Sequence, residues 1–269
     1  MNILIIYNQT KDVNEEKLKI LIDLLKSEKI NYVINSNYEN MDEQINLCCK
    51  NSENYKLIIS LGGDGTVMHG CKYALKYNVP IVGINIGKLG FLTQIDINDI
   101  YILKNFFSKK YKIDERVVLE VNINNNTYYA VNDLVVARGK FVKLIDLNLY
   151  CNDQKVCQYR ADGMIIATPT GSTAYSLAAG GPIVDATIKG MIVTPISSHS
   201  LKDRSIIFDK DKKLSVESFS DDALMISCDG KIVDEIHKND KVYVKISNKI
   251  CKFINFDNRY YLKIFDNPI

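Results

Sequence analysis

Three apolar runs early in the chain constrain its fold most strongly, because none of them alternates with polar residues. They span Ile3–Ile6, Leu57–Leu61 and Ile81–Ile84. Such runs are typical of strands that are covered on both faces, as in a parallel sheet. Between the first two runs, four apolar residues from Leu18 to Leu25 recur at helical spacing. We therefore predict an α/β fold, a parallel sheet with flanking helices, for this part of the chain.

The pattern changes after a predicted helix through Phe106 and Phe107. Later segments alternate apolar and polar residues between turn signals, which indicates strands. The strand candidates are residues 117–123, 128–136, 144–150, 213–219, 224–228 and 241–246. We expect an α/β domain at residues 1–100 and a mostly β domain at 101–254, with the tail 255–269 packing back on the first domain.

Composition narrows the classes of partner. The net charge is only +2, so nothing global attracts nucleic acid or an acidic membrane. Seven cysteines form an odd number without a CxxC pair, which disfavours disulfides and a structural zinc site. The chain has neither a basic leader nor an apolar stretch of membrane-spanning length, so we predict a cytoplasmic protein with small-molecule partners.

The run Leu57–Leu61 leads directly into Gly62-Gly63-Asp64-Gly65-Thr66, and helical spacing follows. Glycines let the backbone approach a phosphate chain, and the free N–H groups that open a helix favour an anion. A carboxylate at Asp64 would repel phosphates unless it binds Mg²⁺ or takes a proton from an attacking hydroxyl. The alternative is a tight turn in which Asp64 caps the helix. The loop matches neither the Walker nor the Rossmann pattern.

A second segment, residues 160–182, places an apolar strand before a turn rich in hydroxyl groups. Ser172 or Thr173 is predicted to cap a short helix through Ala179, which the following glycines and proline would end. This arrangement collects hydroxyl donors and helix amides in one place. The alternative is an ordinary corner between a strand and a helix.

The GGDGT loop resembles that of a kinase superfamily that includes NAD kinases, diacylglycerol and sphingosine kinases, and phosphofructokinases. Together with Asn132-Asp133, Asp162-Gly163 and the segment Thr168–Tyr175, it resembles the NAD kinase family across nearly the whole chain. The resemblance implies an N-terminal α/β domain, a C-terminal β domain, a divalent metal, and assembly into homodimers or homotetramers.

The same resemblance implies a role for individual residues. Asp64 would accept the proton. The adenine end would be surrounded by Asn132, Thr173 and Ala174, with Tyr175 stacking nearby and Phe91 lining the adenosine pocket. Arg160 and Asp162 would face the nicotinamide half of the same site or of a neighbouring subunit's site. Family members often carry Glu at the position of Asp133. The expected substrate-binding residues are Gly65, His69, Phe91, Asn132, Asp133, Arg160, Asp162, Thr170, Thr173, Ala174, Tyr175, Ser176, Ala178 and Asp229.

Several of these residues also have an ordinary structural interpretation. Arg160 and Asp162 would form a local ion pair. His69 would be an exposed helix residue, and Asp229-Gly230 would be a favoured hairpin turn.

The resulting functional hypothesis is an NAD kinase. It would transfer a phosphoryl group from ATP, or from another donor such as polyphosphate, to the 2′-hydroxyl of the adenosine ribose of NAD, giving NADP. Mg²⁺ would arrive with ATP, held mainly by phosphate oxygens, with Asp64 as a candidate ligand and without dedicated protein ligands. The alternatives are a lipid kinase that shares the GGDGT loop and an NAD-binding sensor that has lost turnover.

Overall fold

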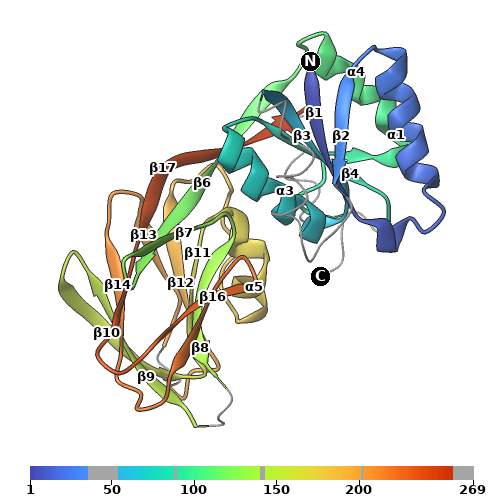
Figure 1. Ribbon diagram of the computed structural model, residues 1–269. Helices are drawn as coiled ribbons and strands as arrows, with labels where there is room; N and C mark the ends of the chain where they lie inside the picture. The colour runs from blue at the N-terminus through green and yellow to red at the C-terminus, as the bar shows by residue number, and fades with distance from the viewer. Residues whose placement is uncertain (36–53, 88–89, 140–142, 201–202, 257–269) are drawn as a thin grey trace. The chain divides into compact units, whose positions relative to one another are not determined.

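The computed structural model describes residues 1–35, 54–87, 90–139, 143–200 and 203–256 (Figure 1). It divides into two compact units, Met1–Glu115 with the chain from Cys251 onward, and Arg116–Ile250. The division thus falls later than the boundary expected near residue 100, and the chain returns to the first unit within its last strand. The tail 255–269 was expected to pack back on the first domain. Its residues from 257 onward lie outside the described ranges.

The first unit is the α/β unit. Its elements are β1 (Asn2–Tyr7), η1 (Gln9–Lys11), α1 (Glu16–Ser27), β2 (Asn31–Asn35), β3 (Tyr55–Gly62), α3 (Asp64–Tyr77), β4 (Ile81–Asn85), β5 (Ile95–Asp96), η2 (Ile97–Leu103) and α4 (Lys104–Phe107). Four strands pair in the order β4-β3-β1-β2, and each pairing is parallel. The predicted parallel sheet is confirmed.

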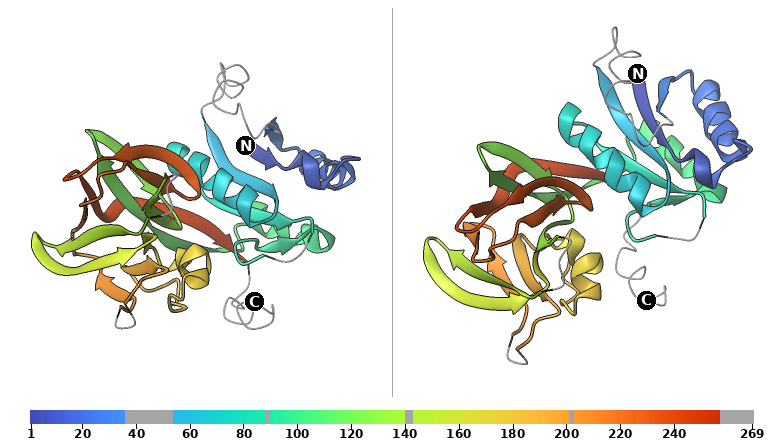
Figure 2. Two further views of the ribbon diagram at one scale, coloured as in Figure 1. Left: turned by 90° about the horizontal axis from the view of Figure 1, so that it is seen from below. Right: turned by 60° about the horizontal axis from the view of Figure 1, so that its bottom comes forward.

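Helices cover both faces of this sheet. Alternate residues of β1, such as Ile3 and Ile5, share a core with the leucines of α1. The opposite face packs on α3, where Gly70 lies close to Ile58 and Ser60 of β3. Figures 1 and 2 show α3 running alongside β3. Because both faces are covered, the strands are apolar without alternation, as the sequence indicated.

The second unit is mostly β. Its elements are β6 (Lys112–Ile123), β7 (Asn126–Ala130), β8 (Asp133–Arg138), β9 (Ile145–Cys151), β10 (Gln154–Ala161), β11 (Gly163–Ala167), η3 (Thr170–Thr173), α5 (Tyr175–Ala178), β12 (Gly190–Ile196), β13 (Ile206–Asp209), β14 (Leu214–Ser218), β15 (Leu224–Cys228), β16 (Lys231–Ile236) and β17 (Lys241–Asn255). Strands β6 and β17 cross the division between the units.

Two sheets of this unit share one hydrophobic core. One sheet has the order β13-β12-β11-β8-β15-β16, and the other contains β10, β9, β14, β17, β6 and β7. Leu119 of β6, Leu147 of β9 and Met164 of β11 are fully buried in the common core. The shared core explains why apolar residues alternate with polar ones along most of these strands.

Three local predictions were wrong. The single strand expected at 128–136 is two strands, β7 and β8, which belong to different sheets because the chain turns at Val131-Asn132. Strand β17 is longer than expected because its second part pairs with β4 through Phe253. Ser172 caps no helix: its hydroxyl donates to the carbonyl of Pro169 and accepts from the amide of Val184.

The described cysteines, Cys71, Cys151, Cys157, Cys228 and Cys251, are all free thiols, as predicted. Cys48 and Cys49 lie outside the described residues. No helix within the described ranges is long and apolar enough to cross a membrane.

The packing of α3 on β3 yields a stability prediction. A Cβ atom on Gly70 would lie 2.2 Å from Ser60 Oγ and 2.8 Å from Ile81 Cδ1, whereas one on Gly65, in the same helix, would meet nothing within 4 Å. We expect Gly70→Ala to lower the free energy of unfolding by about 1–3 kcal/mol, as overpacked cores do. Gly65→Ala should leave it nearly unchanged. Urea unfolding of both variants is the measurement, and equal midpoints would contradict this packing.

Candidate functional site

The glycine loop lies where β3 meets α3. Gly63 is the N-terminal cap residue of α3 and provides no side-chain cap, while Asp64 is the first residue of the helix. The amides of Thr66 and Val67 donate to the Gly63 carbonyl, at 2.9 and 3.1 Å. The loop thus lies directly before a helix N-terminus, where the sequence predicts an anion site.

The Asp64 carboxylate is held by a loop that follows β4. Its Oδ2 accepts from the amide of Phe91 and its Oδ1 from the amide of Leu92, both at 2.9 Å. A Cβ atom on Gly90 would lie 2.1 Å from Asp64 Oδ1, so only glycine permits this approach. The interpretation of Asp64 as a helix cap is wrong, because its acceptor capacity serves this loop rather than its own helix. The structure thus brings together the Asp64 carboxylate and the backbone of Phe91, which are both expected site residues.

Sequence reasoning missed a cation at this loop. The Lys11 Nζ atom lies 2.9 Å from the position that a Cβ atom on Gly63 would occupy. Lys11 ends η1, directly after β1, and the amide of Asn8 donates to the carbonyl of Leu61 at the end of β3. Neighbouring parallel strands end at the same edge of the sheet, so the order of β1 beside β3 was the signal that would have found Lys11.

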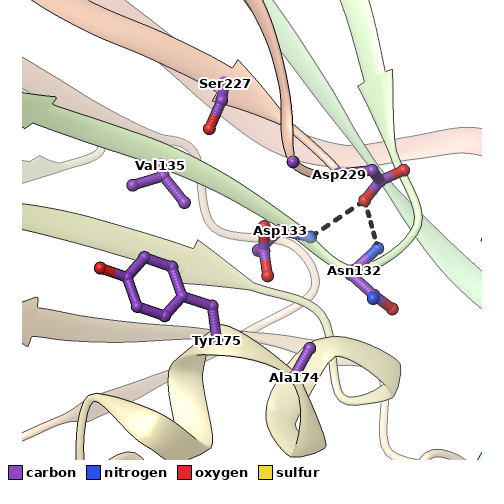
Figure 3. Close-up of a pocket in the computed structure, with 8 residues that line it drawn as sticks. Asn132, Asp133, Val135, Ala174, Tyr175, Ser227 and Asp229 are labelled. Atoms are coloured by element: carbon purple, nitrogen blue, oxygen red, sulfur yellow. Dashed lines mark hydrogen bonds between the residues drawn. The ribbon is translucent and has the colours of Figure 1, made fainter. Parts of the chain in front are cut away.

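A pocket of about 450 Å³ lies in the second unit (Figure 3). Five of its lining residues were expected at the substrate: Asn132, Asp133, Ala174, Tyr175 and Asp229. Figure 3 shows Ala174 and Tyr175 on one side of Asp133, with Ser227 and Asp229 on the other. The pocket thus brings together three segments that lie far apart in the sequence.

Val135, Ser227 and Gly230 complete the lining and were not predicted. Val135 and Ser227 are partners across the antiparallel pairing of β8 and β15. Val135 and Ser227 lie side by side because of the register between these two strands, and that register cannot be read from the sequence.

The Asp229-Gly230 turn joins β15 to β16, as the hairpin interpretation predicted. Both residues have positive φ, 49° and 76°. The Asp229 carboxylate accepts hydrogen bonds from the amides of Val131, Asn132 and Asp133. Figure 3 shows the bonds from Asn132 and Asp133. Asp229 therefore has two roles at once: it lines the pocket and it holds the Asn132-Asp133 segment.

Asp133 is the electrostatically unusual residue of the pocket. Its side chain is 5% exposed, and no group among the described residues donates a hydrogen bond to its carboxylate. Burial, and then the charge of nearby Asp229, raises the pKa of Asp133 to about 7. Beside it, the Asn132 Oδ1 atom is buried and has no partner within the described residues. Two acceptors at this end of the pocket therefore have no hydrogen-bond donor among the described residues.

The hydroxyl-rich turn uses part of its polar groups within the protein. Thr170 is 4% exposed and accepts from the guanidinium of Arg116, and the Ser176 hydroxyl pairs with that of Thr194. Thr173 donates weakly to the Thr170 carbonyl, and Ala178 is exposed. Arg116 was not predicted, since its partner is 54 residues away in the sequence.

The remaining candidates lie elsewhere. Asp162 forms its ion pair with Arg138 of β8, at 3.2 Å, rather than with its near neighbour Arg160. The local pair suggested by the sequence does not form: Arg160 lies at an exposed position of β10, whereas the amide of Arg138 donates to the carbonyl of Asp162 at 3.1 Å and places its side chain beside the carboxylate of that residue. His69 of α3 is half-buried, with its ring 5.8 Å from that of Tyr73.

Within the described residues, no group of three or more His, Cys, Asp or Glu side chains is arranged to hold a metal. A single carboxylate, Asp64, lies at the glycine loop. This donor set fits a magnesium ion that is bound mainly by substrate phosphates, with one carboxylate at most.

Comparison with known proteins decides the family. The model of the ATP-NAD kinase N-terminal domain matches residues 4–111, and that of the ATP-NAD kinase C-terminal domain matches residues 131–256. The chain belongs to the NAD kinase family. An NAD kinase of Caldicellulosiruptor saccharolyticus is 39% identical over 212 residues, which cover 78% of this chain and 77% of that protein. One of Clostridium tetani is 38% identical over 216 residues, with the same coverage.

Solved NAD kinases share the fold. A yeast NADH kinase, crystallised with NADH, superposes with a TM-score of 0.85 at 23% identity and covers 99% of this chain and 86% of its own. An NAD kinase from Archaeoglobus fulgidus, in complex with ATP, gives a TM-score of 0.80 at 23% identity, covering 99% and 98%. The predicted family, the two-part fold and the phosphotransferase class are confirmed, and the lipid-kinase alternative is not supported.

The environment of Asp133 predicts how stability depends on pH. A raised pKa means that the folded state holds its proton up to about pH 7, so this contribution to stability is lost as pH rises from about 4 to 7. We expect Asp133→Asn to match the wild type near about pH 4 and to exceed it above about pH 7, by a few kcal/mol at most.

Thermal unfolding of both proteins across this pH range is the measurement. Asp153→Asn is the control, because that carboxylate is exposed in a turn whose positive φ suits Asn. A difference between Asp133→Asn and wild type that stays constant with pH would disprove the buried charge.

Proposed function

We propose that this chain transfers the γ-phosphoryl group of ATP to the 2′-hydroxyl of the adenosine ribose of NAD, giving NADP, with Asp64 as the general base. The observation that carries the assignment of Asp64 is its fixed carboxylate at the open end of α3, bound by the amides of Phe91 and Leu92. The acceptor is proposed from the relatives, which are named NAD kinases. The donor is proposed from the A. fulgidus enzyme, which was solved with ATP.

The geometry suits proton acceptance by Asp64. A carboxylate has about four lone-pair sites, and two amide hydrogen bonds leave the others open to a hydroxyl. The amides fix the plane of the carboxylate, so its open sites keep one direction. The attacking oxygen loses its proton to Asp64 as its bond to the γ-phosphorus forms and the bond to the β-phosphate oxygen breaks.

Phosphate binding is assigned to the glycine loop and to Lys11. The loop supplies first-turn amides, and Lys11 supplies the positive charge that a Walker loop would carry in its own motif. The divalent cation, when bound with ATP, spreads the charge of the transferred group.

The pocket of the second unit is assigned to the adenosine. The Asn132 amide carries both donors and an acceptor, which suits it to the adenine edge. Ionised Asp133 accepts from ribose hydroxyls, and Tyr175, 47% exposed, offers a ring for stacking. The assay for this function is NADP formation from NAD, ATP and Mg²⁺. NAD binding without turnover would favour the sensor alternative.

Asp64→Asn tests the general base. Asn accepts no proton at neutral pH, so NADP formation should fall by about 10²–10⁴-fold while NAD still binds. Steady-state rates, with NAD titration by calorimetry, are the measurements. Asp23→Asn, an exposed carboxylate on α1, should keep full turnover. Unchanged turnover in Asp64→Asn would remove Asp64 from this role.

Lys11→Ala tests the phosphate cation. Losing a charged donor should raise the KM for ATP about tenfold, with little change in the KM for NAD. Lys19→Ala on α1 removes an exposed lysine of the same unit and should change neither constant. If Lys11→Ala and Lys19→Ala behave alike, Lys11 does not bind phosphate.

A further inference from the structure

One residue is tied to the Asn132-Asp133 segment by four hydrogen bonds. Asp229 Oδ2 accepts from the Val131 amide at 2.9 Å, and Oδ1 accepts from the amides of Asn132 at 2.7 Å and Asp133 at 3.2 Å. The Asp229 amide itself donates to the carbonyl of Asp133 at 2.9 Å. These contacts join positions up to 98 residues apart in the sequence.

The segment needs this support because of where it lies. β7 ends at Ala130 and β8 begins at Asp133, and the two strands belong to different sheets. Where the chain passes from one sheet to the other, three consecutive amides donate to the same carboxylate. A carboxylate satisfies all three, since two oxygens offer about four lone-pair sites, and its charge strengthens each bond.

We propose that Asp229 is a positioning residue of the adenosine pocket, which acts by fixing the place of Asn132 and Asp133 through their backbone amides. The proposal rests on the proposed function, because it concerns how that pocket recognises NAD. Asp229 lines the pocket, yet both of its carboxylate oxygens are directed to the backbone of the segment (Figure 3).

The charge of Asp229 distinguishes this role from structural support alone, because the charge also affects the pKa of Asp133. The titratable side chains that line the pocket with Asp133 are Asp229, from the β15–β16 turn, and Tyr175, from α5. The negative charge of Asp229 contributes to the raised pKa of Asp133. Removing that charge lowers the pKa of Asp133, so its carboxylate ionises at lower pH.

The backbone at Asp229 allows variants that preserve the turn. Its φ of 49° lies in the left-handed region, which Asn and Gly tolerate better than other residues. Asp229→Asn keeps the turn and one acceptor oxygen but removes the charge. Asp229→Gly keeps the turn and removes the whole side chain. Asp153→Asn is a matched control, since it makes the same change in another turn, at a φ of 64°.

The experiment measures KM for NAD, KM for ATP and kcat on the full chain between about pH 5.5 and 9. In the wild type, KM for NAD should fall as pH rises through about 7, because ionised Asp133 accepts both hydroxyls of a ribose. Asp133→Asn should lack this dependence. Asp229→Asn should raise KM for NAD about tenfold, with KM for ATP unchanged, and should shift the dependence to lower pH. Asp229→Gly should raise KM for NAD further.

Two results overturn the proposal while NADP formation itself stands. One is an Asp229→Asn enzyme with the wild-type KM for NAD and pH profile. The other is an unshifted pH profile with equal losses for NAD and ATP, which would mean general damage to the fold. The double variant of Asp133→Asn and Asp229→Asn distinguishes action through Asp133 from general damage to the fold. The effects of the two substitutions on KM for NAD should be non-additive if Asp229 acts through Asp133. A wild-type chain that forms no NADP refutes the proposed function, and the inference falls with it.

Discussion

Aspartate carboxylates that accept hydrogen bonds from main-chain amides organise both units of this chain. Asp64 accepts from Phe91 and Leu92, and Asp229 accepts from Val131 through Asp133. Asp12, which is 7% exposed, does the same for α1 by accepting from the amides of Lys17 and Leu18. In each case a loop or helix end has amides that regular structure leaves without acceptors, and one charged side chain satisfies two or three of them.

The same interaction serves different ends, depending on what surrounds the carboxylate. Asp64 lies at an open helix end among glycines, so its remaining lone pairs are available for chemistry. Asp229 lies in a hairpin turn and meets three amides, so its acceptor capacity is largely used inside the protein. The negative charge of Asp229 also raises the pKa of the neighbouring Asp133 carboxyl. A residue that supports the backbone thereby also changes the electrostatics of the pocket.

Local patterns predicted what local physics determines. The parallel sheet followed from unbroken apolar runs, and the Asp229-Gly230 turn followed from residue types that tolerate positive φ. The resemblance gave five residues that line one pocket. The break at Val131-Asn132, the cation Lys11, and the partners Arg138 and Arg116 were missed. Each of them depends on which strands become neighbours, and that order is set by packing over the whole unit rather than by spacing along the chain.

The length of the side chain at position 133 gives these observations a common consequence. Asp carries its carboxyl one methylene closer to the backbone than Glu would, and therefore closer to the segment whose amides donate to Asp229. The short side chain keeps the carboxyl buried beside a second negative charge, and both effects raise its pKa. A ligand that donates hydroxyl groups offsets this cost by satisfying the ionised form. Under the proposed function, the buried Asp133 carboxyl, which has no donor among the described residues, therefore suits a ligand with several hydroxyl groups, such as a ribose.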